Sequence, residues 1–400
     1  MTIKFQFNQL PHIDSKSLEL LSSAHVNQAL NFHASFPEYR PTPLANLKNL
    51  AGHVGLAGIH VKDESHRFGL NAFKVLGGSF AIGKYIAQQL GTDISELDYQ
   101  TLTSPAVREQ LGELTFATTT DGNHGRGVAW TANRLQQHAV VYMPKGTQPI
   151  RLEHIKKLGA TACITDMNYD DTVRMTATQA QQHDWVIVQD TAWEGYTDIP
   201  AWIMQGYATM GLEAIAQLQA QNIIPTHIFL QAGVGSMAAA ILGLFANMFT
   251  PCPHTVIVEA EQAACFYKSA VAGDGRIHNV AGDLQTIMAG LACGEVNPTA
   301  WEIISKHATL FVSCPDWVAA NGMRILGNPL ANDQRVVSGE SGAVTVGLLH
   351  AIMTEPQYAN IKYKLQLNEH SQVLLFSTEG DTDPQMYRQV VWGGDYSRSK

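Results

Sequence analysis

Charged side chains are scarce in this sequence of 400 residues, at 15% of the total against about 25% in typical soluble domains. The balance is also one-sided, because 26 basic residues face 35 acidic ones and leave a net charge of −9. This shortage of Lys and Arg argues against a nucleic-acid partner, whose phosphates need concentrated positive charge. Hydrophobic residues still make up 45%, so we expect a folded core and not a disordered chain.

Long apolar runs are also missing. The most apolar stretch, residues 237–249, is interrupted by Asn247 and falls short of the roughly 20 residues that a membrane-spanning helix needs. The first residues lack the apolar region and cleavage site of a secretory signal. The five cysteines are widely spaced, with no C-x-x-C pair, which favours reduced thiols over disulfides or zinc. We therefore expect a cytoplasmic protein that does not contact a membrane.

Strand-like and helix-like segments alternate along the chain. Pro41 and Pro43 exclude helix around them, and a helix is predicted from Asn71, as N-cap, toward Leu90. The expected strands are residues 59–63, 114–118, 139–143, 161–165, 185–189, 227–231, 255–259 and 372–377. The expected helices that follow are residues 126–137, 149–158, 171–182 and 237–247. This rhythm predicts parallel sheets with right-handed crossovers.

The pattern predicts an α/β fold with two domains, each a mostly parallel sheet flanked by helices. Residues 1–80 and 205–400 are expected to form the large domain, with residues 81–204 inserted into it as a small domain. The active site is expected in the cleft between the two domains.

Lys74 stands at the predicted start of a helix, behind a polar loop and before Gly77 and Gly78. The partly positive helix N-terminus disfavours a cation there. With burial, this environment is expected to lower the pKa of the lysine and favour the neutral amine that forms a Schiff base. Taken alone, the segment more often marks an ordinary surface lysine.

Residues 118–127 (TTTDGNHGRG) follow a predicted strand and open a helix. Open α/β sheets bind ligands at such carboxyl ends of parallel strands. Backbone N–H groups there hold carboxylates, and Asn123 and His124 add side-chain donors. A capped strand-to-helix turn without a ligand fits the composition equally well.

The glycine loop at residues 231–238 (QAGVGSMA) follows another predicted strand. Its glycines allow close backbone approach, and Ser236 offers a hydroxyl donor, as in a phosphate-binding loop. The loop also matches G-x-G-x-x-A, and Glu259 ends the next strand, so a nicotinamide-dependent dehydrogenase is an alternative. A tight turn without a ligand is a third interpretation.

Ser377 and Thr378 end the last predicted strand, where a hydroxyl can hydrogen-bond a heterocycle nitrogen. A polar loop that caps a helix is the simpler interpretation of this segment alone. The 16 histidines show no H-E-x-x-H spacing, so no metal site is expected. The G-x-S-x-G motif of serine hydrolases is missing as well.

The order of these segments, from P-T-P-L at residues 41–44 to residue 383, resembles the fold-type II pyridoxal phosphate enzymes, which include the serine and threonine dehydratases. Longer segments are similar to those of the diaminopropionate ammonia-lyases. They are KDESHRFGLNAFKVLGG, FATTTDGNHGRGVAW, VVYMPKG, TDMNYDDTV, VQDTAWEGY, QAGVGSMA, IMAGLACGE, SGESGAV and STEGDTD. Two departures support this closer resemblance, because Asp121 and Ala72 stand where the wider group usually has serine.

The resemblance implies a lyase that uses pyridoxal 5'-phosphate to convert D- and L-2,3-diaminopropionate to pyruvate and two ammonia. Lys74 would hold the cofactor as a Schiff base, and Asn123 would donate to its phenolic oxygen. Ser377 or Thr378 would face the pyridine nitrogen. The phosphate would be bound by Gly233, Val234, Gly235, Ser236 and Met237. A homodimer is also implied.

Two bases are expected, because one base reaches only one face of the planar substrate–cofactor adduct. By resemblance Lys74 would serve the L form and Asp121 the D form. Asp190 would bind the β-amino group or relay protons to it. The expected substrate-binding residues are Thr120, Asp121, Gly122, His124 and Asp190.

Three other functions remain open at this point. A serine or threonine dehydratase, acting also on D-serine, would use the same chemistry with hydroxide as the leaving group. A nicotinamide-dependent dehydrogenase would use the glycine loop and Glu259 but give Lys74 no role. An inactive binding module would need neither the lysine nor the two acids. Absorbance spectra with and without substrate separate these functions.

Overall fold

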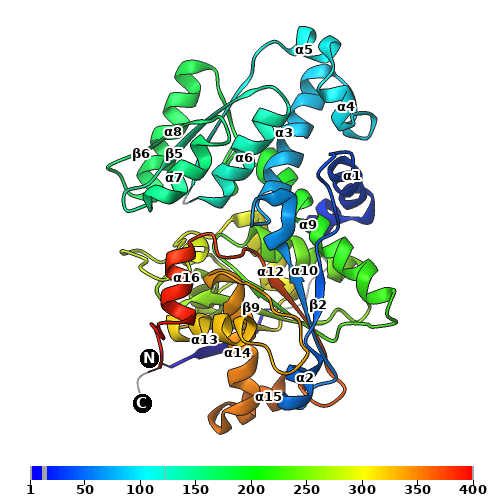
Figure 1. The fold of residues 1–400 in the computed structure, drawn as a ribbon, viewed down its shortest axis with the longest axis vertical. Helices are drawn as coiled ribbons and strands as arrows, with labels where there is room; N and C mark the ends of the chain where they lie inside the picture. Colours follow the sequence, from blue (N-terminus) through cyan, green and yellow to red (C-terminus); the bar gives the residue numbers. More distant parts are fainter. Residues whose placement is uncertain (1, 11–15, 121, 399–400) are drawn as a thin grey trace. The chain divides into compact units, whose positions relative to one another are not determined.

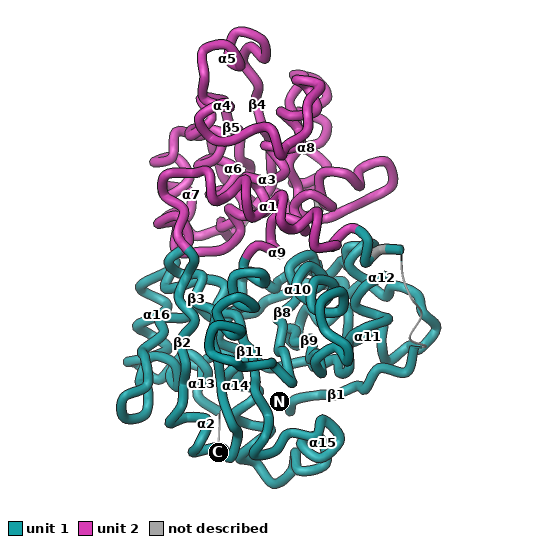
Figure 2. Tube along the Cα trace, turned by 90° about the vertical axis from the view of Figure 1, so that its right-hand side faces the viewer, with its two compact units in different colours: residues 1–19, 41–66, 210–400 teal, residues 20–40, 67–209 magenta. Residues whose placement is uncertain are grey.

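The computed structural model describes residues 2–10, 16–120 and 122–398 (Figure 1). These residues form two compact units, which Figure 2 colours separately. Unit 1 comprises Met1–Glu19, Pro41–His66 and Met210–Lys400, and unit 2 comprises Leu20–Arg40 and Arg67–Thr209. Unit 2 thus contains residues 20–40, 67–80 and 205–209 besides the whole predicted insertion of residues 81–204. The division at residues 80 and 204, with a cleft between the domains, stays a prediction.

Unit 1 is built on a seven-stranded sheet with the order β1-β10-β9-β8-β11-β3-β2. Its four inner pairings are parallel, whereas the edge strands β1 and β2 run antiparallel to their neighbours. The strands are β1 (Lys4–Phe7), β2 (Leu44–Asn46), β3 (Gly58–Asp63), β8 (His227–Gln231), β9 (His254–Ala260), β10 (Leu310–Cys314) and β11 (Gln372–Ser377). The inner strands are buried along their length because helices cover both faces of such sheets.

Helices pack against this sheet and against each other. Helices α13 and α14 contact each other, and α14 lies on β8 and β11, while α10 packs on α12 (Figure 1). The helices of unit 1 are α2 (Lys48–Val54), α10 (Ser236–Met248), α11 (Cys265–Ala272), α12 (Pro298–His307), α13 (Asp316–Gly327), α14 (Glu340–Thr354), α15 (Ala359–Lys364) and α16 (Pro384–Val391). Apolar side chains of the strands, α2, α13 and α14 form its core.

Unit 2 contains a four-stranded, all-parallel sheet with the order β6-β5-β4-β7. Its strands are β4 (Thr115–Thr119), β5 (His138–Met143), β6 (Thr161–Ile164) and β7 (Val186–Ile187). Its helices are α1 (Ser23–Ala34), α3 (Val75–Leu90), α4 (Tyr99–Leu102), α5 (Pro105–Leu111), α6 (Asn123–Arg134), α7 (Pro149–Lys156) and α8 (Tyr169–His183). Helix α9 (Asp198–Gln219) runs across the boundary at Thr209. Short 3-10 helices occupy Lys16–Leu21, Glu64–Gly69, Ile94–Glu96, Glu261–Ala263, Ala289–Leu291 and Pro356–Tyr358.

The strand order of unit 2 reverses at β4. The chain moves from β4 through β5 to β6 and then returns to the other side of β4 as β7. Right-handed crossovers therefore place α6 and α7 on one face and α8 on the other. Helix α8 packs on β4, β5 and β7, where Ala117, Val140 and Ala180 form a small core. Ligand crevices of open α/β sheets occur outside the carboxyl ends of strands at such a reversal.

The predicted fold class is confirmed, and β8 and β11 have the predicted bounds. The predicted helix start at Asn71 is wrong, because Asn71 has a positive φ of 58° and α3 begins at Val75. Helix α6 begins three residues before the predicted start, and β7 is shorter than predicted. None of the described helices is long and apolar enough to cross a membrane.

Candidate active site

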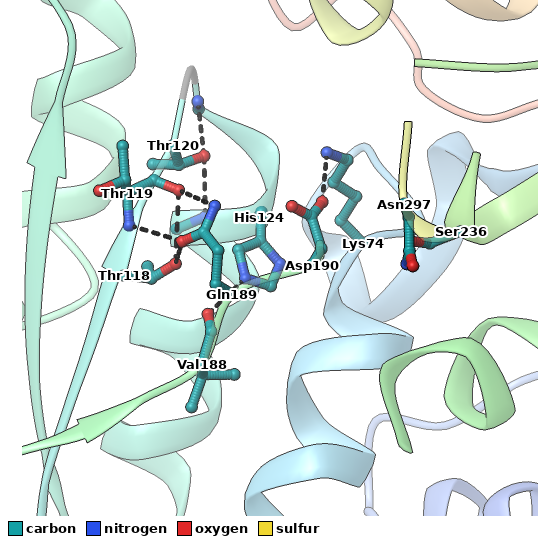
Figure 3. Close-up of polar contacts among 12 residues, drawn as sticks. Lys74, Thr118, Thr119, Thr120, His124, Val188, Gln189, Asp190, Ser236 and Asn297 are labelled. Carbon is teal, nitrogen blue, oxygen red and sulfur yellow. Dashed lines mark hydrogen bonds and ion pairs between the residues drawn. The ribbon is translucent and has the colours of Figure 1, made fainter. Parts of the chain in front are cut away.

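Lys74 directly precedes the first residue of α3, where the backbone is already helical, with φ −61° and ψ −17°. Its side chain is 19% exposed, and Nζ donates a hydrogen bond to Oδ2 of Asp190 at 2.9 Å (Figure 3). Both residues belong to unit 2, although more than a hundred positions separate them in the sequence. The fold therefore joins two of the three predicted catalytic residues in one ion pair.

The carboxyl group of Asp190 is buried and carries a negative charge at neutral pH. Burial by itself would raise its pKa, but the Lys74 cation, the nearby His124 and the hydrogen bond from Nζ lower the pKa to about 2. A carboxylate at 2.9 Å also stabilises the protonated form of the lysine amine. This pairing opposes the expectation that the helix end and burial alone would favour a neutral amine.

The segment after β4 is shaped by one threonine hydroxyl. Oγ1 of Thr120 accepts hydrogen bonds from the backbone N–H groups of Gly122 at 2.9 Å and Gly125 at 3.1 Å. These bonds satisfy donors at the N-terminus of α6 and explain why the helix begins at Asn123. Predicted residue Asn123 is thus the first helical residue, and Asp121 lies outside the described residues.

His124 contacts the segment that precedes Asp190 in the sequence. Its Nε2 lies 2.7 Å from the carbonyl oxygen of Val188, so this nitrogen carries a proton and donates it. The ring is buried, and its position contributes to the low pKa of Asp190. The main-chain bond assigns His124 a part in holding the segment before Asp190, besides its predicted contact with substrate.

The glycine loop of unit 1 joins β8 to α10. Gly235 has a φ of +95°, and a Cβ atom there would lie 2.2 Å from the ring of Phe266. A Cβ atom on Gly233 would lie 2.9 Å from the carbonyl oxygen of Gly290. Both positions therefore require glycine. Helix α10 begins at Ser236, so the N–H groups of its first turn are oriented as in anion-binding sites. The residues present fit a phosphate group.

Asn297 braces this loop and was not found by sequence reasoning. Its Nδ2 donates to Oγ of Ser236 at 2.9 Å, and its backbone N–H donates to the carbonyl oxygen of Val234 at 2.9 Å. Its Oδ1 accepts from the N–H of Thr299 and caps α12. The Asn-Pro pair at a helix start is a recognisable capping signal, but the contact with Ser236 has no local sequence signal.

Ser377 is the last residue of β11 and Thr378 directly follows the strand, and both side chains are buried. Oγ1 of Thr378 accepts a hydrogen bond from Nε2 of Gln231 at 2.8 Å, and Oγ of Ser377 donates to the carbonyl oxygen of Glu379 at 3.4 Å. Gln231 ends β8, so this bond connects the strand before the glycine loop to β11. Which hydroxyl faces the cofactor ring stays a prediction.

Glu259 does not suit the dehydrogenase alternative. Its side chain is fully buried and accepts the N–H groups of Phe266 at 2.8 Å and Tyr267 at 2.7 Å. A ribose-binding carboxylate must reach the ligand, whereas this one caps the start of α11. The five cysteines are all free thiols, and the described residues contain no cluster of His, Cys, Asp and Glu that could hold a metal ion.

Comparison with known proteins supplies a family for this site. Residues 36–362 match the family model of the pyridoxal-phosphate dependent enzymes. The chain is 52% identical over 398 residues to the diaminopropionate ammonia-lyase of Escherichia coli strain K12, which covers 99% of this chain and 98% of that enzyme.

Solved structures of the Escherichia coli diaminopropionate ammonia-lyase are similar over the same length. The complex with D-serine superposes with a TM-score of 0.92 at 50% identity and covers 99% of this chain and 98% of the other. The complex with an aminoacrylate–pyridoxal phosphate azomethine reaction intermediate gives a TM-score of 0.90 at 50% identity, with the same coverage.

Proposed function

The chain belongs to the diaminopropionate ammonia-lyases, a family of pyridoxal-phosphate-dependent enzymes, and we propose that it converts D- and L-2,3-diaminopropionate to pyruvate and two ammonia. The contact between Lys74 and Asp190 carries this proposal. It brings an amine able to bind the cofactor within 2.9 Å of a buried carboxylate able to bind a substrate ammonium. The 52% identity to the Escherichia coli enzyme supports the choice of substrate.

Pyridoxal phosphate, when bound, supplies the electron sink that allows an amino acid to lose its α-proton. Lys74 would hold this group, and its amine would remove the α-proton of the L form. Backbone N–H groups of Gly233, Val234, Gly235 and Met237, together with Ser236, would hold its phosphate. Asn123 would donate to its phenolic oxygen, and Ser377 or Thr378 would face its pyridine nitrogen.

Asp190 binds the β-ammonium group and does not donate a proton to it. A carboxyl group with a pKa of about 2 is ionised at neutral pH and is a weak proton donor there. Its charge keeps the substrate's β-amino group protonated, and an amine leaves readily only in that form. This refines the predicted role of Asp190, in which proton relay was the second option.

Asp121 is the base for the D form, and Thr120, Gly122 and His124 shape the segment that holds the substrate carboxylate. The second base has to act on the face of the substrate opposite to the one that Lys74 serves. Changing Asp121→Asn should reduce turnover of the D form far more than that of the L form. Equal losses for the two enantiomers in a folded protein would contradict the two-base mechanism.

A serine or threonine dehydratase is the second candidate that uses the same chemistry. The identity to the ammonia-lyase and the buried carboxylate beside Lys74 favour a substrate with two ammonium groups. D-serine fits the same site because the related Escherichia coli enzyme has been crystallised with it. We therefore propose D-serine as a side substrate.

One experiment tests the function. The purified protein with pyridoxal phosphate should release ammonia and pyruvate from each diaminopropionate enantiomer in a two-to-one ratio. Lys74→Ala should abolish both products and the visible absorbance of the lysine-bound cofactor. Lys84→Ala, in helix α3 that follows Lys74, serves as the matched control and should retain both. Absence of pyruvate release by the unaltered protein would refute the proposed function.

The protein is further proposed to act in the cytoplasm as a homodimer. Five free cysteines support a reducing compartment, because secreted proteins commonly oxidise theirs. The proposal of a homodimer rests on the resemblance to this family. Light scattering of the purified protein tests the oligomeric state, and a mass of one chain would contradict it.

A further inference from the structure

Gln189 is a buried amide next to Asp190 in the sequence, and its side chain completes the sheet of unit 2. Its Oε1 accepts from the backbone N–H of Thr119 at 3.0 Å, and its Nε2 donates to the carbonyl oxygen of the same residue at 3.1 Å (Figure 3). The amide therefore binds the end of β4 as a neighbouring strand would. It lies where the backbone pairing of β4 with β7 has already ended.

Further bonds fix the amide from both sides. Oε1 also accepts from Oγ1 of Thr118 at 3.0 Å, and Nε2 also donates to the hydroxyl of Tyr169 at 2.8 Å. The backbone N–H of Gln189 donates to the hydroxyl of Tyr196 at 2.8 Å, which in turn donates to the carbonyl oxygen of Ile187. Both side-chain polar atoms and the main-chain N–H are thus satisfied in a buried position.

The position of this amide matters because the strand order reverses at β4. β4 keeps pairing with β5 as far as Thr119, while the backbone after β7 leaves the sheet toward Asp190. Because the side chain of Gln189 is long and polar, it can hydrogen-bond the end of β4 after the backbone has left the sheet. The next residue, Asp190, then reaches Nζ of Lys74.

We propose that Gln189 is a positioning residue, whose amide fixes the Asp190 carboxylate against Lys74 by tying its backbone to Thr119. This role depends on the proposed function only in the choice of substrate for the turnover measurement. It predicts that loss of the amide changes the charge environment of Lys74 as well as turnover. A merely structural amide would change stability alone.

The test uses Gln189→Met, which keeps the shape of the side chain but makes none of these hydrogen bonds. The first readout is the pH midpoint of the visible absorbance of the cofactor bound to Lys74. We expect the midpoint to move to lower pH, because a displaced carboxylate stabilises the lysine-derived cation less. The second readout is turnover: kcat/KM for diaminopropionate should fall about 100-fold, and kcat/KM for serine, which has no β-ammonium, should fall less.

Gln189→Glu provides a second variant if the methionine variant does not fold. It keeps an acceptor for Thr118 and Thr119 but replaces the donor to the Thr119 carbonyl by a carboxylate oxygen, and the same split between substrates is expected. Because the new carboxylate itself stabilises a nearby cation, the absorbance midpoint is compared only for Gln189→Met. The matched control is Gln179→Met on α8, where the side-chain amide donates a hydrogen bond to Oε1 of Gln182. The control should match the unaltered protein in both readouts.

A double variant separates positioning from a general effect. In Gln189→Met combined with Asp190→Asn, the absorbance midpoint should equal that of Asp190→Asn alone, because coupled residues are not additive. Additive shifts, or a lower unfolding temperature with an unchanged midpoint and equal losses for both substrates, would overturn the proposal. If the unaltered protein shows the cofactor absorbance but releases no pyruvate, the proposed function fails while the absorbance test of Gln189 stands.

Discussion

At the scale of single residues, the centre of this protein is a pair of opposite charges that share one hydrogen bond. Lys74 and Asp190 are mostly removed from water, so their attraction is screened less than that of a surface pair. Removing either partner leaves a buried charge without compensation, which is more costly than losing the attraction itself. Each charge in the pair therefore needs the other as its partner, and the pair at the same time prepares the site.

The first prediction concerns acid stability. The pKa of Asp190 is lowered from 3.8 to about 2 in the folded protein. Its contribution is therefore fully present above a pH of about 4 and is lost as the pH falls toward 2, where the folded carboxylate takes up its proton. The shift corresponds to about 2 kcal/mol. Unfolding of the unaltered protein and of Asp190→Asn, followed between pH 6 and 2, measures it.

The stability difference between these two proteins should shrink as the pH falls through this window. Asp166→Asn, at an exposed carboxylate of the same unit, is the control and should show no such convergence. A difference that stays constant down to pH 2 would refute the assignment of the low pKa to Asp190.

At the scale of elements, the glycine loop between β8 and α10 sets the space for the phosphate. The second prediction is that Gly235→Ala strongly weakens binding of pyridoxal phosphate, because the added methyl would lie 2.2 Å from the Phe266 ring at a φ of +95°. Gly273→Ala is the matched control, since Gly273 has a φ of +66° but open space around its Cβ position. The control should cost about 1 kcal/mol of backbone strain and leave cofactor affinity unchanged.

Cofactor affinity in both variants is measured by equilibrium dialysis, and unfolding by circular dichroism. Equal effects of the two substitutions on affinity would show that the loop tolerates a side chain at residue 235. Its contact with Phe266 would then not define the phosphate site.

The third prediction concerns Asn297, which holds the same loop from the start of α12. Asn297→Asp keeps the oxygen that caps Thr299 but removes the N–H donor to Ser236, and its new charge repels a phosphate. One lost hydrogen bond is worth about 1 kcal/mol, so cofactor affinity should fall at least about 5-fold while α12 stays capped. Asn328→Ala, at an exposed asparagine after α13, is the control. Unchanged affinity in Asn297→Asp would exclude the bracing role.

Elements were predictable from sequence where local composition decides them. β8 and β11 are apolar runs buried along almost all of their length, and their predicted bounds are the observed ones. β7 is shorter than predicted because the side chain of Gln189 takes over the ladder, and α6 begins early because Thr120 caps it. Such side-chain bonds leave no periodic pattern in the sequence.

In the site, too, local sequence indicated single residues but not the contacts between them. The sequence indicated Lys74 and Asp190 separately, and only the fold shows that they touch. Gln189 and Asn297 act through contacts with residues distant in the chain, Thr119 and Ser236, so no local motif reveals them. Strand β10 was missed, although all its residues are buried, because a five-residue apolar run is compatible with either a strand or a helix.

At the scale of the whole molecule, the two units carry buried carboxyl groups with opposite pKa shifts. In unit 2, the pKa of Asp190 is lowered to about 2. In unit 1, burial raises the pKa of Glu259 to about 8, although the N–H groups of Phe266 and Tyr267 oppose this change. A pH falling below about 4 therefore weakens unit 2, whereas a pH rising from 4.5 to about 8 weakens unit 1. The stability of the protein should be greatest between these limits, and the two units need not unfold together.

The fourth prediction follows from Glu259. Its folded pKa lies above the unfolded value of 4.5, so its contribution is fully present below pH 4.5 and is lost as the pH rises toward 8. Glu259→Gln removes the titrating group at the cost of one of the two N–H bonds, so the variant should be less stable at pH 5 yet lose less stability up to pH 8. Thermal unfolding at several pH values gives the slope of stability against pH for the variant and for the unaltered protein. Glu295→Gln, at an exposed acid of the same unit, should keep the slope of the unaltered protein. Parallel slopes for Glu259→Gln and the unaltered protein would mean that Glu259 stays ionised throughout, with the start of α11 stabilising its charge.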